Sequence, residues 1–257
     1  MLFELGGKRK RVIQVIYVCL AVLMFVALVG FGIGGNVSGG IFDAVGLGGG
    51  DSASDPRYDA QIERAEQTLQ TDPKDEKALL TLARTHFLAG QAATETDEQG
   101  RVTLTDETLG RYEEATAAWE RYLATKPKEP DDGVASLMVQ SYSATASADP
   151  TQLEAAVDGA FRAAQVVAEA RPSAGTNLQL ATYAYLAGED EVAKQAEQAA
   201  LKDAVDSTTR NQIKTQLAQA KQQGEAIARA IKQSAPDQGQ LENPLGDLGG
   251  TSPVPGG

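Results

Sequence analysis

The stretch "TLARTHFLAG", residues 81–90, is followed much later by the similar stretch "QLATYAYLAG", residues 179–188. Both copies carry Leu-Ala at the same offset, and both end in Leu-Ala-Gly. The packing positions of the first copy are spaced at i, i+3, i+4 and i+7, as on one face of a helix: Leu79, Leu82, Ala83 and His86. The repeated spacing predicts that one helical element occurs more than once. We expect Gly90 to end the first of these helices as a left-handed cap.

The composition of the central part of the chain is typical of a helical protein. Glycine and proline gather at residues 30–56 and 234–257. Between them the chain is rich in Ala, Glu, Gln, Leu, Lys and Arg, which have the lowest free-energy cost in a helix. No segment alternates β-branched and polar residues as a strand does. The sequence therefore predicts an all-α fold.

Residues 12–33 carry no charge and are almost entirely apolar. A helix needs about 20 apolar residues to cross a bilayer core, so this segment predicts a transmembrane helix. A cleaved signal peptide has a shorter apolar stretch and a small-residue exit site, which this segment lacks. The single cysteine, Cys19, lies inside this segment, so the chain forms no intramolecular disulfide.

The charges around this segment predict its orientation. Four basic residues lie at positions 8–11, and the next basic residue is Arg57. The positive-inside rule keeps residues 1–11 in the cytoplasm and sends the rest of the chain across the membrane. Of the 23 basic and 35 acidic residues, four basic and one acidic residue precede position 12, which leaves the exported part a net charge of about −15. This charge repels nucleic acid and anionic headgroups, so we expect no nucleic-acid binding.

The exported part divides into three segments by composition. Residues 34–55 are rich in Gly, Ser and Asp and predict a flexible linker. Residues 56–233 predict the helical domain. Residues 234–257 are rich in Gly and Pro, contain too few apolar residues to bury a core, and predict a disordered tail.

A second helical segment, residues 111–127, follows the first copy. Its packing positions again form one face, and a proline closes it: Tyr112, Ala115, Trp119, Tyr122, Leu123 and Pro127. With these residues and those of the first copy, the chain resembles the tetratricopeptide repeat (TPR), a 34-residue unit of two paired helices. The spacing from Leu79, the first matching position, to Pro127 exceeds the corresponding spacing in the family by about 20 residues. Residues 91–110 are therefore predicted to be an insertion between the paired helices.

Two weaker units follow in the same register. The second unit has an excess of about nine residues near position 149, where Asp149 and Pro150 predict the cap and first residue of a helix. The third unit departs from the family at Asn177, Ala184 and Glu197, where aromatic residues are usual. A striped helix within residues 207–233 is expected to cap the array. The stripe consists of Ile213, Leu217, Ala220, Ile227 and Ile231.

The resemblance implies an α-solenoid of about three helical hairpins with a C-terminal capping helix, and the alternative is a non-repeating helical bundle. TPR arrays bind peptides or partner helices in a concave face lined by the first helix of each hairpin. The residues implied for that groove are Leu80, Arg84, Phe87, Leu88, Gln140, Leu178, Thr182, Tyr185 and Leu186. In an alternative interpretation, some of these residues only pack one repeat against the next. The Lys/Asn set with which cytosolic co-chaperone TPR domains clamp a carboxylate is missing.

Few residues of the chain could act in catalysis or in metal binding. The only histidine, His86, occupies a repeat packing position and has no partner residue at metal-binding spacing, so we expect it to pack rather than to act as a ligand or base. The acidic insertion lacks the spacing of a calcium loop and is expected to be a solvated loop with a short hairpin around Gln99 and Gly100. The usual nucleophile, phosphate-binding and zinc-protease motifs are absent. We therefore expect no enzyme, no cofactor, no metal and no small-molecule substrate.

The overall plan resembles the membrane-anchored bacterial TPR subunits that accompany the Sec translocon. This resemblance implies a single-pass protein of the bacterial cell membrane that binds other proteins or peptides outside the cytoplasm and contacts the lipid bilayer through residues 12–33. A chaperone-like holder of secreted chains is one expected role. The alternative is a structural scaffold of an envelope or cell-division complex that binds one folded partner.

Overall fold

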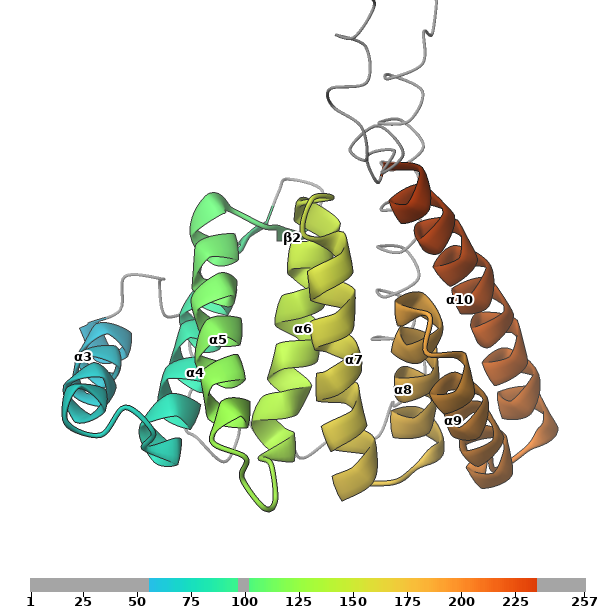
Figure 1. Cartoon of the computed structure of the whole chain (residues 1–257), viewed down its shortest axis with the longest axis horizontal. Helices are drawn as coiled ribbons and strands as arrows, with labels where there is room; N and C mark the ends of the chain where they lie inside the picture. The colour runs from blue at the N-terminus through green and yellow to red at the C-terminus, as the bar shows by residue number, and fades with distance from the viewer. Residues whose placement is uncertain (1–55, 97–101, 235–257) are drawn as a thin grey trace, which may run out of the picture.

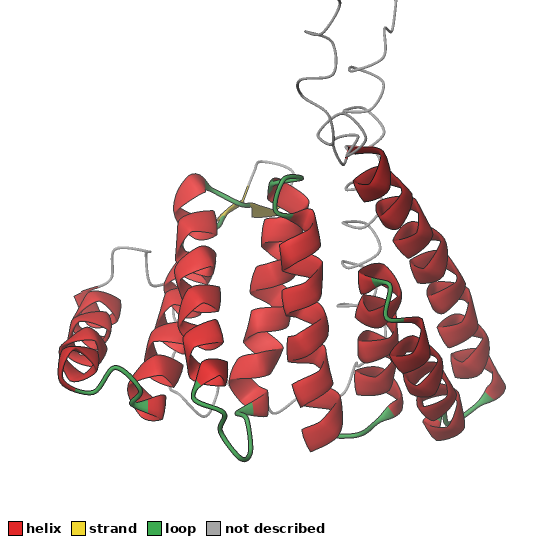
Figure 2. Cartoon of the chain, viewed as in Figure 1, coloured by secondary structure: helices red, strands yellow, loops and turns green. Residues whose placement is uncertain are grey.

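The computed structural model describes residues 56–96 and 102–234, which form an all-α fold (Figures 1 and 2). The helices of these residues are α3 (Pro56–Thr71), α4 (Glu76–Ala92), α5 (Asp106–Ala124), α6 (Asp132–Ala148), α7 (Leu153–Ala170), α8 (Ala174–Ala187), α9 (Asp190–Asp203) and α10 (Ser207–Ser234). The predicted basic segment, transmembrane helix and linker, and the predicted tail beyond Ser234, lie outside the described residues. Among the helices just named, none is long and apolar enough to cross a membrane.

The helices pack as pairs that stand side by side in a row from α3 to α10 (Figure 1). The most extensive packing joins α4 to α5, α6 to α7, and α8 to α9. Contacts of α5 with α6 and of α7 with α8 connect each pair to the next. At the ends of the row, α3 packs on α4 and α10 packs on α8. Each pair therefore buries apolar side chains against its neighbours as well as within itself, and Leu79, Trp119 and Met138 are fully buried.

The helices α4, α5, α6 and α8 begin at residues whose side chains cap them. The side chains of Asp75, Thr105 and Asp131 each accept a hydrogen bond from the backbone N–H three residues further on. Ser173 forms a capping box with Thr176 at the start of α8. Each cap satisfies one of the N–H groups that lack a partner in the first turn of a helix. The caps thus fix the first residues of α4, α5, α6 and α8.

Gly90 has a different role from the one predicted, because α4 continues through it to Ala92. Gly90 is buried, and a Cβ atom at this position would lie 2.8 Å from ring atoms of Tyr112 on α5. A glycine is therefore needed here for the close approach of two helices and not for a left-handed cap. The matching residue of the second copy, Gly188, does cap α8 in the left-handed conformation, with φ of 79°.

The predicted start of α7 is also wrong. The helix begins at Leu153, and Gln152 precedes it without a side-chain cap. The carboxylate of Asp149 instead accepts hydrogen bonds from the backbone N–H and the hydroxyl of Thr151, at 2.8 and 2.7 Å. Because α6 extends to Ala148, several of the extra residues of this unit lengthen a helix.

The two ends of the connection between α4 and α5 lie close together. Strand β1 (Glu95–Thr96) pairs with strand β2 (Val102–Thr103) in antiparallel register, on either side of the predicted turn, which lies outside the described residues. The hydroxyl of Thr105 donates to the carbonyl oxygen of Ala93 at 3.1 Å and so joins the two helix ends. Within the segment 91–110, the first residues belong to α4 and the last to α5.

The packing around Gly90 gives a test of helix approach. Alanine is better than glycine inside a helix by about 0.5–1 kcal/mol, yet Gly90→Ala should destabilise the chain by about 1–3 kcal/mol because the added methyl overlaps Tyr112. The Tyr112 ring cannot easily move, since it stacks on Phe87 with ring centroids 5.4 Å apart. The matched change Gly110→Ala, on α5 with no atom within 4 Å, should raise the melting temperature. Equal melting temperatures for the two variants would contradict this account.

Candidate functional site

The solvent-facing part of the predicted groove is a row of residues along α4. Leu80, Arg84 and Leu88 follow one another at intervals of four residues, which places them on one face of the helix. All three are half-buried, and the two leucines pack against the core with part of their surface exposed. Gln140 lies exposed on α6, which contacts α4. We call these four residues the α4–α6 strip.

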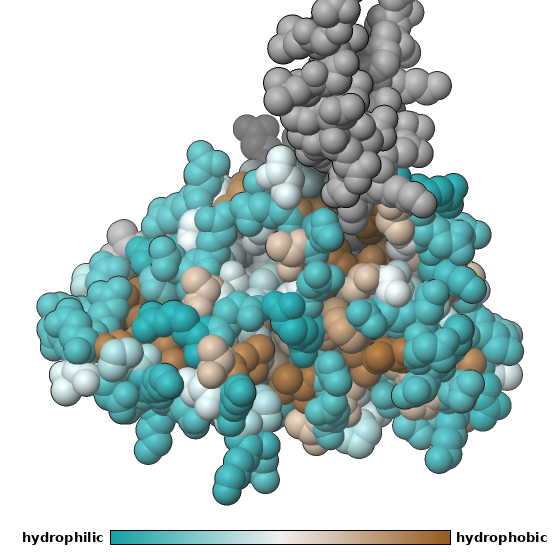
Figure 3. All heavy atoms as spheres, in the orientation of Figure 1, coloured by the Kyte–Doolittle hydropathy of each residue, from teal (hydrophilic) through white to brown (hydrophobic). Residues whose placement is uncertain are grey.

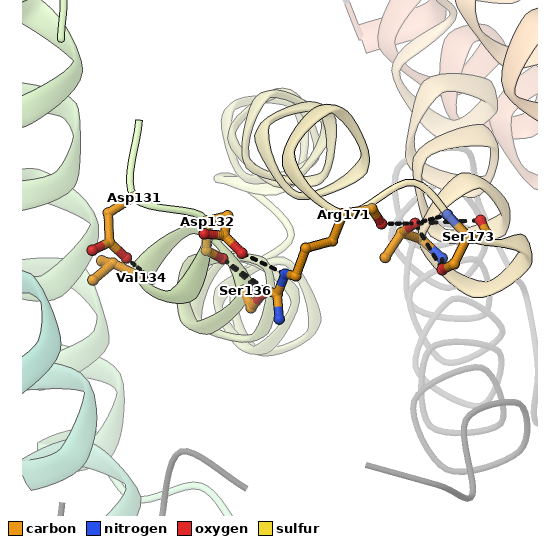
Figure 4. Close-up of polar contacts among 7 residues, drawn as sticks. Asp131, Asp132, Val134, Ser136, Arg171 and Ser173 are labelled. Atoms are coloured by element: carbon orange, nitrogen blue, oxygen red, sulfur yellow. Dashed lines mark hydrogen bonds and ion pairs between the residues drawn. The ribbon is translucent and has the colours of Figure 1, made fainter. Parts of the chain in front are cut away.

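Arg84 connects the strip to the next helix pair. Its Nη2 lies 4.0 Å from Oδ2 of Asp131, and the two side chains are 42% and 35% exposed. Its Nε is buried and has no hydrogen-bond partner among the described residues. The other carboxylate oxygen of Asp131 accepts from the Val134 N–H at 2.7 Å and caps α6 (Figure 4). Because the ion pair is long and partly exposed, it is weak, and the guanidinium group remains able to bind a carboxylate or carbonyl oxygen.

The first turn of α6 is held from the other side by Arg171, just after α7 (Figure 4). Its Nε pairs with the carboxylate of Asp132, and its Nη2 donates to Ser136 Oγ at 2.9 Å and to the Asp132 carbonyl at 3.2 Å. Beside these residues lies a cleft of 530 Å³ between the α5–α6 connection and α7, whose lining includes Glu129, Asp131, Asp132 and Glu169. These contacts join the first turn of α6 to the end of α7, next to Asp131 and its partner Arg84.

The other five predicted groove residues are buried within the chain: Phe87, Leu178, Thr182, Tyr185 and Leu186. Phe87 is only 1% exposed and stacks on Tyr112. The Tyr185 hydroxyl donates to Glu197 Oε2 at 2.7 Å, and burial together with this carboxylate raises the pKa of Tyr185 to about 12. In this structure the five residues pack helices together, which is the alternative role considered above. We therefore leave them out of the α4–α6 strip.

His86 is a packing residue at the edge of a second cleft. It is 7% exposed and lines a cleft of 340 Å³ between α3, α4 and α5. Burial lowers the pKa of His86 below its ordinary value of 6.5, the positive charge of Arg111 lowers it further, and the negative charge of Glu114 opposes both. Its Nδ1 is buried without a partner in the described part of the chain. The imidazole is therefore neutral at pH 7.

The remaining surface is mostly polar. On the side seen in Figure 3, hydrophilic residues cover most of the helices, and apolar residues reach the surface in small patches between them. Within residues 56–96 and 102–234, no three His, Cys, Asp or Glu side chains form a group that could hold a metal ion.

Comparison of the chain with protein-family models, with curated proteins and with solved structures finds no match. The function is therefore inferred from the chain's own residues.

Two polar features, one in the α4–α6 strip's surroundings and one between the helix pairs, were missed from the sequence. Asp131 was not identified as the partner of Arg84, although an Asp directly before an apolar helical segment is a recognisable cap signal. The second feature is Glu120, which accepts from the Tyr142 hydroxyl at 2.5 Å and from Arg162 Nη2 at 2.6 Å and so links α5, α6 and α7. Burial and this carboxylate raise the pKa of Tyr142 well above its ordinary value. These three residues are far apart in the sequence, and no local pattern connects them.

The neutral state of His86 gives a prediction about pH. The folded state holds the pKa of His86 below 6.5, so the unfolded state binds the proton more readily and acid favours unfolding. Stability should fall as pH decreases from 7 to 5, beginning near the unfolded pKa of about 6.5. Because the chain has one histidine, His86→Gln should make the free energy of unfolding less dependent on pH in this window. Denaturant titrations at pH 7, 6 and 5 measure this, and equal slopes for the two chains would exclude the mechanism.

Proposed function

We propose that the chain is a single-pass protein of the bacterial cell membrane whose exported domain is a TPR-like α-solenoid that binds other proteins. The three hairpins are α4–α5, α6–α7 and α8–α9, with α10 as the capping helix. Support comes from the contacts between these pairs and from fully buried alanines at the small-residue positions of the repeat, such as Ala83 and Ala115. The predicted transmembrane helix, residues 12–33, anchors the domain with the N-terminus in the cytoplasm.

The observation that carries the proposal is the α4–α6 strip. Two half-buried leucines flank a half-exposed arginine on one helix face, and an exposed glutamine lies on the neighbouring helix. This arrangement suits a polypeptide that supplies apolar side chains to Leu80 and Leu88 and a carboxylate or carbonyl oxygen to Arg84. Leucines that are partly exposed in the free chain gain by further burial, at about 25 cal/mol per Å² of apolar surface.

Two roles use such a surface. In the first, the protein holds unfolded secreted chains near the translocon, and the net charge of about −15 on the exported part favours neutral or basic clients. In the second, it is a scaffold that binds one folded partner in an envelope or division complex. Neither role includes catalysis or a cofactor.

A matched pair of leucine substitutions tests the strip. Leu88 on α4 and Leu123 on α5 are both partly buried and packed on the same core, so truncation of either should cost similar stability. A photo-crosslinking residue placed at Gln140 in the full-length chain should capture client proteins in cells. Leu88→Ala should reduce this capture several-fold, whereas Leu123→Ala should not. Equal effects of the two substitutions would mean that the strip is not the binding surface.

The identity of the captured proteins separates the two roles. Many unfolded secreted chains indicate a holder, and one folded envelope protein indicates a scaffold. A crosslinker at Gln195, an exposed residue of α9, is the control for non-specific capture. If it captures the same proteins as the crosslinker at Gln140, the proposal fails.

The proposed orientation has its own test. In a chain whose native Cys19 is replaced by serine, a single cysteine introduced as Ser252→Cys should react with a membrane-impermeant thiol reagent in intact cells, once the reagent can pass any outer barrier. A cysteine introduced in the basic segment, as Leu5→Cys, should react only after lysis. The reverse pattern would place the helical domain in the cytoplasm.

A further inference from the structure

Helix α10 does not follow the stacking order of the earlier helices. Where one helix pair follows another, the first helix of the later pair contacts the second helix of the earlier pair most: α6 packs on α5, and α8 packs on α7. By contrast, α10 packs extensively on α8 and makes few contacts with α9. Figure 1 shows α10 along the outer end of the row, beside α8 and α9. The last helix therefore covers the first helix of the third hairpin.

Gly224 sets the distance between α10 and α8. A Cβ atom at this position would overlap the carbonyl oxygen of Tyr185 and lie 2.8 Å from its carbonyl carbon. The obstacle is backbone, which cannot swing away as a long side chain does. The other described apolar residues that α10 buries are Ile213, Leu217, Ala220 and Ile227. Any residue larger than glycine at position 224 should therefore push α10 away from α8.

The face of α8 on which α10 packs corresponds to the α4 part of the α4–α6 strip. In the repeat register, Leu178, Thr182 and Leu186 of α8 take the places that Leu80, Arg84 and Leu88 take on α4. The three α8 residues, which we call the α8 row, are buried, whereas their counterparts on α4 are half-buried. The third hairpin thus has the same row of positions as the first, on the helix against which α10 packs.

The attachment of α10 is mainly apolar. At its start, Arg210 donates to the carbonyl oxygens of Leu201 and Ala204, both at the long distance of 3.4 Å. Further along, Gln216 Oε1 is buried without a partner among the described residues, which costs free energy in the docked state. In comparison, α8 and α9 share the 2.7 Å hydrogen bond between Tyr185 and Glu197. Release of α10 thus recovers the hydration of Gln216 and exposes mostly apolar surface.

We propose that the α8 row is a second binding surface, that α10 occupies it in the resting chain, and that a helix of a partner protein binds there by displacing α10. The chemistry of the partner follows from α10: an amphipathic helix with Ile or Leu in its stripe and glycine at the crossing point. Recognition of this kind uses anchors that recur every three or four residues along one helix face, and Ile213, Leu217, Ala220 and Gly224 follow this rule at i, i+4, i+7 and i+11. This surface is separate from the α4–α6 strip and does not depend on it.

The first test measures release of α10 in the full-length chain. With Cys19 replaced by serine, Thr182→Cys provides a single thiol in the α8 row, where the native residue is 2% exposed. Gly224→Ala should raise the rate of thiol labelling at least tenfold. Gly110→Ala gives the same gain in helix propensity without a clash and should leave the rate unchanged. Equal labelling rates in the two variants would overturn the proposal.

The second test supplies the helix in trans. A labelled synthetic peptide of residues 207–234 should bind the Gly224→Ala chain at least tenfold more tightly than it binds the parent or the Gly110→Ala chain. Addition of Leu88→Ala should not change this affinity, so that failure of the α4–α6 strip and failure of the α8 row give different results. Equal affinity for parent and Gly224→Ala chains would overturn the proposal.

A third measurement applies even if Gly224→Ala prevents folding, as circular dichroism would show. In the parent chain, the backbone amides of α10 should exchange with solvent at least tenfold faster than those of α6 and α7, because α10 leaves before the array unfolds. Exchange of all three helices at one rate would mean that α10 is released only by global unfolding, and the displacement mechanism would be wrong.

Discussion

The close approach of glycine to tyrosine at three helix contacts is the constraint on which the packing of this domain depends. Gly90 lies against the ring of Tyr112, Gly159 against the ring of Tyr142, and Gly224 against the backbone of Tyr185. At each contact a Cβ atom would come within 3 Å of the tyrosine. Real interiors are packed so densely that such an overlap must move a helix. One glycine in α4, one in α7 and one in α10 therefore set how far apart their helices lie.

The tyrosines at these contacts are fixed by different interactions. Tyr112 stacks on Phe87, whereas the hydroxyls of Tyr142 and Tyr185 donate to the carboxylates of Glu120 and Glu197. A buried hydroxyl without a partner would cost about 1–3 kcal/mol, so each glutamate makes the burial of its tyrosine possible. Polar groups at the hairpins thus support apolar packing and do not form a separate site. This explains why burial and carboxylates raise the pKa values of Tyr142 and Tyr185 without implying catalysis.

The all-α fold and the pairing of helices could be predicted from the sequence because they follow from local composition and from spacing within one helix. The roles of individual residues that depend on tertiary contacts could not. Gly90 and Gly188 end the same Leu-Ala-Gly motif, yet one is packed against Tyr112 and the other is a left-handed cap. The motif is a short stretch of sequence, whereas the residue that decides the role of its glycine lies on another helix. The same limit applies to the predicted groove. Its residues have identical spacing on α4 and α8, and this spacing does not show that α10 packs on α8.

The two rows of predicted groove residues differ at their central position, and this difference decides what each row can accept. Arg84 on α4 keeps 42% of its side chain exposed. A helix docked over it would remove the guanidinium group from water, with only a weak partner at 4.0 Å, and burial of a charge without a good partner costs several kcal/mol. Thr182 on α8 donates its hydroxyl to the Leu178 carbonyl at 2.8 Å and is already satisfied when covered. A close-packed helix is therefore compatible with the α8 row alone, while the α4–α6 strip requires a partner that brings an oxygen to Arg84.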